Sequence, residues 1–171
     1  MGRKQGVDIL AMAAILLKDL PDLVFVFCGN GETRTDLELL CKGLQNVKFI
    51  DIQPQEYLND LLCIADIHLL PQRADVEDSV MPSKLTGMLA SGRAIVATAN
   101  TDSEVANVVS GCGLVVAPEQ PQAFAKAIMT LVNDSTLRLS LGKAGRLYAE
   151  DNLSQDTILK KFEEEVKKLF T

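Results

Sequence analysis

The sequence predicts an α/β protein in which a doubly wound parallel sheet of about five strands carries helices on both faces and an all-helical C-terminal end. Two observations support this class. Short apolar runs alternate with longer amphipathic runs along the first two thirds of the chain, as strands and helices do in βαβ units. The apolar runs are apolar at every position, which is typical of strands that are covered on both faces. With 171 residues, of which 47% are hydrophobic, the chain is long enough for one domain with a substantial core.

The elements follow in order. An apolar helix is expected from Val7 to Asp19 and ends before Pro21. An apolar strand from Leu23 to Cys28 comes next. The other four strands are expected at residues 46–50, 66–71, 94–98 and 113–117. The helices between and after them are expected at residues 32–44, 55–65, 82–91, 102–110, 121–134, 135–151 and 154–170.

The beginning of the chain departs from this pattern. A doubly wound domain opens with a strand, whereas residues 1–6 lead directly into the first helix. Either the sheet starts with the second element, or a first strand precedes this sequence. We favour the second explanation and treat residues 1–171 as a single domain without its first strand.

Composition excludes several classes of protein. The formal net charge is -6 and no basic stripe is visible, so we expect no nucleic-acid partner. The four cysteines lack C-x-x-C spacing, which argues against zinc or a disulfide framework and favours reduced, buried thiols. No run approaches the length of a membrane span, and no signal peptide is visible. We therefore expect a cytoplasmic protein.

Ligands of an open parallel sheet bind beyond the carboxyl ends of its strands. The first loop at this edge, Gly29-Asn30-Gly31, allows the backbone to approach a neutral part of a ligand, although an ordinary strand-to-helix turn explains it equally well. The second loop carries Ile52 and Gln53, an apolar and an amide surface suited to a nucleobase. Alternatively, the proline that follows simply opens a helix.

The third loop runs from Gln72 to Ser83 and contains Arg73. Its acidic residues Asp75, Glu77 and Asp78 could hold a metal ion. We favour a solvated acidic loop, because no second carboxylate cluster supports a metal site.

The helix after this loop is the strongest candidate site. Pro82 suits the first helical position, and the N–H groups of Ser83, Lys84 and Leu85 are then expected to lack partners within the helix. An anion placed there gains those hydrogen bonds, the helix dipole and the Lys84 ammonium. A capping serine, Ser79 or Ser83, with a solvated lysine is the competing interpretation. The position at the carboxyl edge of the sheet favours phosphate.

The only histidine, His68, lies within the expected strand 66–71. A core histidine bonded to a neighbour is a better interpretation than a catalytic base, because no catalytic pairing is readable around it.

These motifs, in this order, resemble the C-terminal half of the group 1 (family 4) glycosyltransferases over essentially the whole chain. The stretches "LVFVFCGNGETRTDLELL", "NVKFIDIQPQEYLNDLLCIADIHLLP" and "MLASGRAIVATANTDSEVANVVSGCGLVVAPEQ" carry the resemblance. The stretch "LPQRADVEDSVMPSKLTGMLASGR" is most similar to the bacterial exopolysaccharide branch of the colanic-acid type. The family has the GT-B architecture of two Rossmann-like domains.

The resemblance implies a nucleotide-sugar donor site, with the first two loops near the base and the Pro82 helix at the diphosphate. The family retains anomeric configuration and needs no bound metal, and the resemblance implies no cofactor. Lys84 and Arg73 are the candidates that stabilise the leaving nucleoside diphosphate. Two glutamates of the family pattern are missing. Gly87 stands where the second, ribose-binding glutamate is usual, and it is kept among the donor-site residues. Gln5, with Lys4 and Arg3 beside it, replaces a usual basic residue.

The resemblance also implies a missing N-terminal acceptor domain, so the chain alone is expected to be inactive. The apolar face of the last helix, with Ile158, Phe162, Val166 and Leu169, is then partly exposed and could pair two copies. Contact with a membrane surface is expected only through the full-length protein. Two alternatives remain open: a non-hydrolysing nucleotide-sugar epimerase of GT-B fold, and a non-catalytic nucleotide-binding module.

Overall fold

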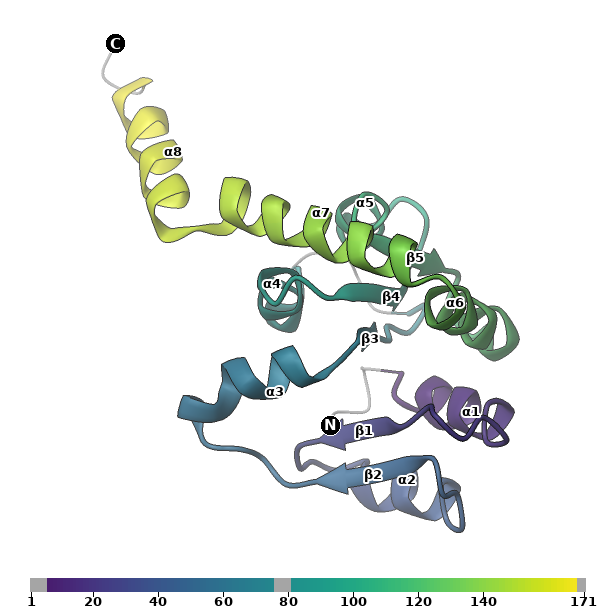
Figure 1. Ribbon diagram of the computed structural model, residues 1–171. Coiled ribbons are helices and arrows are strands. Elements are labelled where there is room, and N and C mark those ends of the chain that lie inside the picture. Colours follow the sequence, from purple (N-terminus) through teal and green to yellow (C-terminus); the bar gives the residue numbers. More distant parts are fainter. Residues whose placement is uncertain (1–5, 76–80, 169–171) are drawn as a thin grey trace.

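The computed structural model describes residues 6–75 and 81–168 as an α/β protein whose five strands all run parallel to their neighbours (Figure 1). Strand β1 (Phe25–Cys28) pairs with β2 (Val47–Ile50). Strands β3 (Ile67–Leu70), β4 (Ala94–Thr98) and β5 (Gly113–Val116) form a second sheet with β4 in the middle. The predicted class and all five predicted strands are confirmed.

Helices separate the strands, as the sequence predicts. In chain order they are α1 (Asp8–Leu16), α2 (Arg34–Leu40), the 3-10 turn η2 (Gln55–Tyr57), α3 (Leu58–Ile64), α4 (Ser83–Ala90), α5 (Glu104–Val109), α6 (Pro121–Asn133), α7 (Ser135–Leu153) and α8 (Gln155–Lys168). The last three follow one another without a strand, which confirms the helical C-terminal end.

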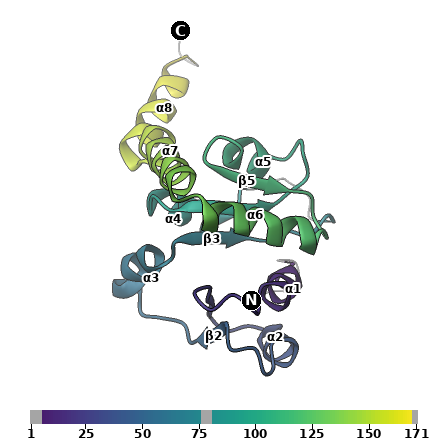
Figure 2. The ribbon, with the colours of Figure 1, turned by 45° about the vertical axis from the view of Figure 1, so that its right-hand side comes forward.

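Two cores lie on opposite faces of the strands (Figure 2). One core contains the buried faces of α1, α2 and α6 together with Phe25, Phe27 and Val96, so it extends over both sheets. The other contains α4, α5 and the later part of α7, packed on Leu70 and Ile95. Strand β4 is buried at every position, because helices cover both of its faces.

The single continuous sheet expected from the sequence is divided into sheets of two and three strands. The expectation that the first strand is covered on both faces is also wrong. Phe25 and Phe27 are buried, but Val24 is 48% and Val26 is 52% exposed. The reason is that α1 and α2 belong to the core on the phenylalanine face, while no described helix buries the opposite face of β1.

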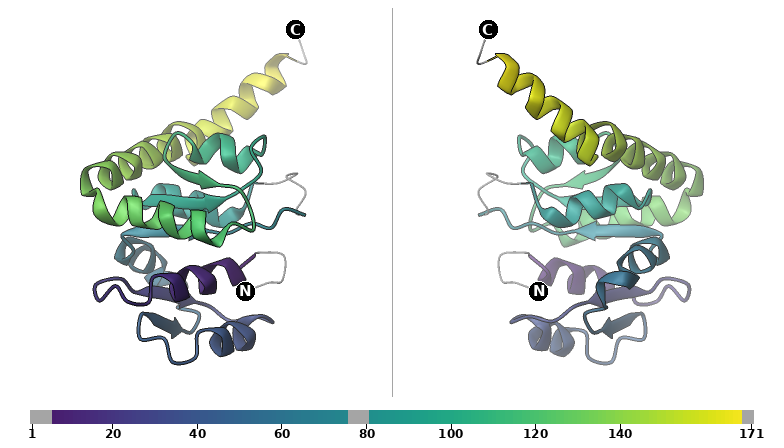
Figure 3. Two further views of the ribbon diagram at one scale, coloured as in Figure 1. Left: turned by 90° about the vertical axis from the view of Figure 1, so that its right-hand side faces the viewer. Right: turned by 90° about the vertical axis from the view of Figure 1, so that its left-hand side faces the viewer.

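The last helix, α8, leaves the body of the molecule, whereas α7 lies across it (Figure 3). Helix α7 crosses the start of β4 so closely that a Cβ on Gly142 would lie 2.2 Å from the carbonyl oxygen of Gly92, and glycine is therefore required there. Helix α8 projects outward, and its Ile158 and Phe162 are 50% and 68% exposed. Leu169, expected on the same face, lies outside the described residues.

Within the described residues, none of the helices is both long and apolar enough to cross a bilayer. All four cysteines are free thiols. Cys41 and Cys112 are buried as expected, whereas Cys63 in α3 is exposed and Cys28 is intermediate, so the prediction of four buried thiols is wrong for these two.

Candidate functional site

The loops after β1 and β2 lie together at the carboxyl edge of their sheet, and the Arg34 side chain joins them. Its guanidinium donates to the carbonyl oxygen of Gly29 (3.2 Å), to the side-chain oxygen of Asn30 and to the carboxylate of Asp51 (2.7 Å). It also donates to Glu38 one turn further along α2 (2.8 Å). Candidate residues of the first loop are thereby held beside the second loop.

This guanidinium is well suited to a fixed structural role. Only 20% of the Arg34 side chain is exposed, and hydrogen bonds to Glu38 and then Asp51 raise the pKa of Arg34. Charge-assisted bonds of a planar, five-donor group fix geometry better than a single ammonium does. Sequence reasoning missed Arg34. An i,i+4 pair with Glu38 was readable, but the longer contact to Asp51 was not.

Both glycines of the first loop have backbone angles that other residues rarely adopt, with φ of +123° at Gly29 and +152° at Gly31. A Cβ on Gly29 would meet no atom within 4 Å, so this backbone faces open space. The second loop is equally accessible: Ile52 is 65% exposed, and Gln53 donates to the carbonyl of Asp51 at 2.9 Å. The two loops thus offer an apolar side chain, an amide and bare backbone at one edge.

Hydrogen bonds to Thr98 anchor Gln72, the first residue of the third loop. The buried Thr98 hydroxyl bridges both backbone groups of Gln72, accepting from its N–H and donating to its carbonyl at 2.7 Å each. Arg73 follows and pairs with Asp75 (2.9 Å), which raises the pKa of its guanidinium. The candidate Arg73 is therefore partly neutralised by a neighbour, which sequence reasoning did not foresee.

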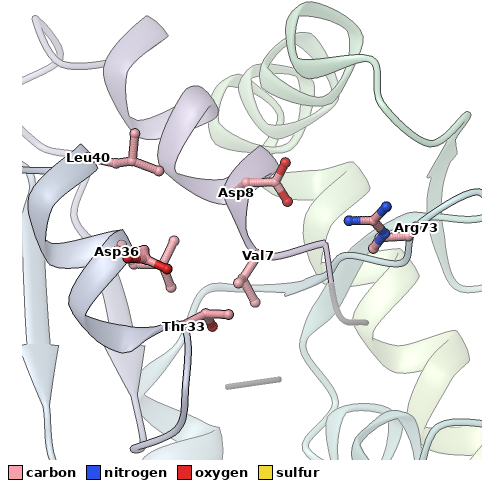
Figure 4. Close-up of a pocket in the computed structure, with 7 residues that line it drawn as sticks. Val7, Asp8, Thr33, Asp36, Leu40 and Arg73 are labelled. Carbon is pink, nitrogen blue, oxygen red and sulfur yellow. The ribbon is translucent and has the colours of Figure 1, made fainter. Parts of the chain in front are cut away.

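A cavity of about 220 Å³ lies between Arg73 of the third loop, the start of α1 and helix α2 (Figure 4). Its lining combines the start of α1 (Val7 and Asp8) with Arg73 and the face of α2 that carries Thr33 and Asp36. Figure 4 shows the Arg73 guanidinium on the side of the cavity where the Asp8 carboxylate lies. A smaller hollow next to it is lined in part by Glu119, whose φ of +60° is the one positive value among described residues other than glycine. No sequence signal identifies Glu119.

The start of α4 differs in one respect from the prediction. Pro82 is the residue before the helix rather than its first residue, and as the N-cap residue it makes no side-chain capping bond. The Leu85 N–H donates to the Pro82 carbonyl at 2.9 Å, so it is not an available donor, and the Leu85 side chain is fully buried. The prediction that the Leu85 N–H lacks a partner is therefore wrong. The tight first turn uses that N–H.

Ser83 and Lys84 are exposed at this helix start. Desolvation by the surrounding protein lowers the pKa of the Lys84 ammonium below its ordinary value. An anion bound beside this amine would favour its charged form. These two residues, with Pro82, remain the candidate phosphate site.

Gly87 lies one turn further along α4 and faces α3. A Cβ there would lie 3.2 Å from a methyl carbon of Leu62, so a glutamate at this position would require Leu62 to move.

His68 has the structural role that was predicted. It is 7% exposed, and its Nε2 lies 3.0 Å from the Ser91 hydroxyl. That hydroxyl also donates to the Met88 carbonyl (2.6 Å). Burial first, and then the charge of Arg93, lower the pKa of His68 to about 4. The imidazole therefore fastens β3 to the end of α4 as a neutral group.

Several predicted residues fall outside the described parts of the chain, namely Glu77, Asp78 and Ser79 in the third loop and Arg3, Lys4 and Gln5 at the beginning. Across residues 6–75 and 81–168, no three acidic, histidine or cysteine side chains are grouped as a metal site requires.

Parallel strands whose loops follow their carboxyl ends, where ligands of open α/β sheets bind, together with helices on both faces, define a doubly wound α/β domain. Residues 1–134 match the family model described as glycosyl transferases group 1. The chain belongs to this family, and the expected resemblance is confirmed.

Individual proteins with similar sequences or structures are also glycosyltransferases. The chain is 33% identical over 167 residues to the colanic acid biosynthesis glycosyl transferase WcaI of Escherichia coli (strain K12), covering 95% of this chain and 40% of the relative. The C-terminal domain of a group 1 family protein, LpcC of Francisella tularensis, has a TM-score of 0.76 at 22% identity, covering 91% of this chain and 83% of that one. Anabaena HepE, solved with UDP, has a TM-score of 0.82 at 17% identity, covering 98% and 46%. The chain thus spans less than half the length of WcaI and HepE.

Proposed function

We propose that this chain is the donor-binding half of a retaining glycosyltransferase. The intact enzyme moves a hexose from a UDP- or GDP-linked donor to a growing surface polysaccharide. The similarity to WcaI supports the choice of acceptor, and the likeness to HepE, solved with UDP, supports a nucleoside diphosphate as the leaving group.

The observation that carries the proposal is the start of α4. Exposed Ser83 and Lys84 open a helix that its N-cap residue Pro82 does not cap, at the carboxyl edge of the second sheet. The helix dipole and the ammonium stabilise the negative charge that develops on the departing diphosphate. No cofactor or metal is assigned a role, since fixed positive groups supply this stabilisation.

The loops after β1 and β2 are assigned to the nucleobase of the donor. Ile52 and Gln53 offer an apolar surface and an amide to the base, and the backbone of Gly29 to Gly31 lies open beside them. Arg34 keeps these two loops in register. Arg73 is already paired with Asp75, so it approaches the sugar diphosphate only if that pair opens.

The acceptor site and the rest of the catalytic machinery are assigned to an N-terminal domain of the intact protein, so residues 1–171 alone should transfer no sugar. We place the enzyme in the cytoplasm, with any contact to the membrane surface made by the full-length protein. Exposed Ile158 and Phe162 of α8 suit either that second domain or a second copy.

The epimerase alternative needs acid–base groups in the cleft. The single histidine of the sequence is buried, with a pKa near 4, so it supplies none. This observation favours the transferase.

Titration calorimetry on the intact protein tests the proposal. Lys84→Ala should weaken UDP or GDP binding about 10- to 100-fold and leave nucleoside binding unchanged, because one charge-assisted contact is lost. Lys143→Ala, which removes an exposed lysine of α7, is the matched control. Equal losses for diphosphate and nucleoside would remove Lys84 from the phosphate role. Failure of the unaltered protein to bind either diphosphate would refute donor binding itself.

A further inference from the structure

The loop between β1 and α2 contains the only Asn-Gly pair of the sequence, Asn30-Gly31. Both residues are exposed and lie outside the helices and strands. The ladder with β2 ends one residue earlier, at the bond from the Gly29 N–H to the Ile50 carbonyl (3.0 Å), and α2 begins only at Arg34. The chain at this pair can therefore change its local conformation, in contact with water, without breaking a strand or a helix.

The chemistry open to this pair needs no reagent except water. The backbone nitrogen of Gly31 attacks the side-chain amide carbon Cγ of Asn30. The N–Cγ bond forms, the Cγ–Nδ2 bond breaks, and ammonia leaves with the proton of the Gly31 nitrogen. Water then opens the five-membered succinimide ring at one of its two carbonyls, which gives aspartate or isoaspartate. Glycine favours the closure because it has no Cβ to obstruct the approach and has the widest choice of backbone angles.

The Arg34 side chain favours the first step. Its guanidinium donates to the side-chain oxygen of Asn30, and it also binds the Gly29 carbonyl and the Asp51 carboxylate. Because a guanidinium is only a donor, the Asn30 atom that it meets is the amide oxygen. Attack on Cγ places negative charge on this same oxygen. A fixed cation there stabilises that charge, as the donors of an oxyanion hole do.

Both residues of the pair also have a structural reason to be present. Gly31 has a φ of +152°, at which a residue with a Cβ is strained. Asn30 supplies the oxygen through which Arg34 holds the loop. The other asparagines of the sequence are all followed by residues that carry a Cβ, which hinders the same closure. The loop after β1 therefore joins the most reactive asparagine of the chain to a geometry that requires the glycine beside it.

We propose that Asn30 is a site of spontaneous modification in the folded protein, at which ring closure through the Gly31 nitrogen yields aspartate and isoaspartate. Aspartate adds a negative charge to the loop. Isoaspartate also moves a side-chain carbon into the main chain and so lengthens the turn. The modification itself stands on the loop geometry alone. Its consequence rests on the proposed function: a loop that lies beside a bound nucleotide should hold a nucleoside diphosphate less well after either change.

Ageing of the intact protein, followed by peptide mapping with mass spectrometry, tests the modification. The signal is the replacement of –NH2 by –OH at residue 30, and a sample unfolded in urea gives the reference rate. The rate in the folded protein should be within about tenfold of that reference, because an exposed loop opens at little cost in free energy. The rate should be higher in neutral than in mildly acidic buffer, since the attacking nitrogen must lose its proton.

The chain offers an internal control and a matched variant. Asn100 is also exposed and follows a strand, but Thr101 comes after it, so it should stay unmodified in the folded protein. Asn30→Gln keeps an amide oxygen for Arg34 but would have to close a six-membered ring, so it should abolish the change at residue 30. Modification of residue 30 in urea but not in the folded protein would overturn the proposal.

Calorimetry with UDP and GDP tests the consequence separately. Aged protein should bind the diphosphate about fivefold more weakly than fresh protein, the effect of one added charge close to a phosphate in water. Asn30→Asp should reproduce this loss without ageing, whereas the affinity of Asn30→Gln should not change with age. Modification of the folded protein with unchanged nucleotide affinity would confirm the site at Asn30 and would remove the first loop from the proposed donor site.

Discussion

Protonation of His68 should destabilise the fold in mildly acidic solution. The buried imidazole is held neutral with a pKa of about 4. The reference pKa of histidine in an unfolded chain is about 6.5. Between these values the unfolded chain binds a proton that the folded chain does not, so the free energy of unfolding falls as the pH falls through this window. Stability is fully present above pH ~6.5.

The size of the effect follows from the two pKa values. A difference of about 2.5 units at 1.36 kcal/mol per unit limits the loss to about 3 kcal/mol at low pH. Between pH 7.5 and pH 5 the same linkage gives a loss of about 2 kcal/mol. Because His68 holds the Ser91 hydroxyl at the end of α4, the protonated form should also loosen the helix whose start is the candidate phosphate site.

Urea unfolding at pH 7.5 and pH 5 measures this loss, and His68→Gln, which keeps a side-chain donor without a titrating group, is the control. The variant should show a pH dependence smaller by about 2 kcal/mol. His68 is the only histidine, so its imidazole signal can be assigned without ambiguity in an NMR titration. Equal pH dependence in both proteins, or an NMR pKa near 6.5, would refute the reasoning.

Two further predictions concern packing and the loops. Gly142→Ala places a methyl group against a backbone carbonyl of the turn before β4 and should lower the free energy of unfolding by about 3 kcal/mol or more, measured in urea. Gly43→Ala, at φ +85° with open space around it, should cost only about 1 kcal/mol from backbone conformation, and similar losses for both would argue against the close approach of α7. Arg34→Met should accelerate amide exchange in the loops after β1 and β2, whereas Glu38→Gln, which spares the bonds to both loops, should not. Unchanged exchange in Arg34→Met would show that these loops are held by other contacts.

The order of strands and helices could be predicted because apolar runs and their spacing determine which segments are buried. The same runs could not reveal that β1 and β3 are not neighbours. The hydrophobicity of a strand indicates that it is buried but does not identify the element that packs on it. Val24 and Val26 were therefore expected to be buried, whereas they are half exposed.

The local features of the candidate site could be predicted from the sequence, whereas its long-range contacts could not. Glycine turns and a helix start with a lysine are local signals, and both lie at the carboxyl edge as expected. Arg34 forms a salt bridge with Asp51, seventeen positions away in the sequence. A contact over this separation leaves no local sequence pattern. The Leu85 N–H is hydrogen-bonded to the Pro82 carbonyl in a tight first turn. This detail of backbone geometry could not be predicted from the sequence.

The position of the diphosphate in a crystal of the intact protein soaked with UDP or GDP is the most direct test of the donor site. We predict phosphate oxygens about 3 Å from the backbone nitrogens of Ser83 and Lys84 and from Lys84 Nζ. A nucleotide bound with its phosphates in the cavity beside Asp8 and Arg73, and with the start of α4 untouched, would contradict the account.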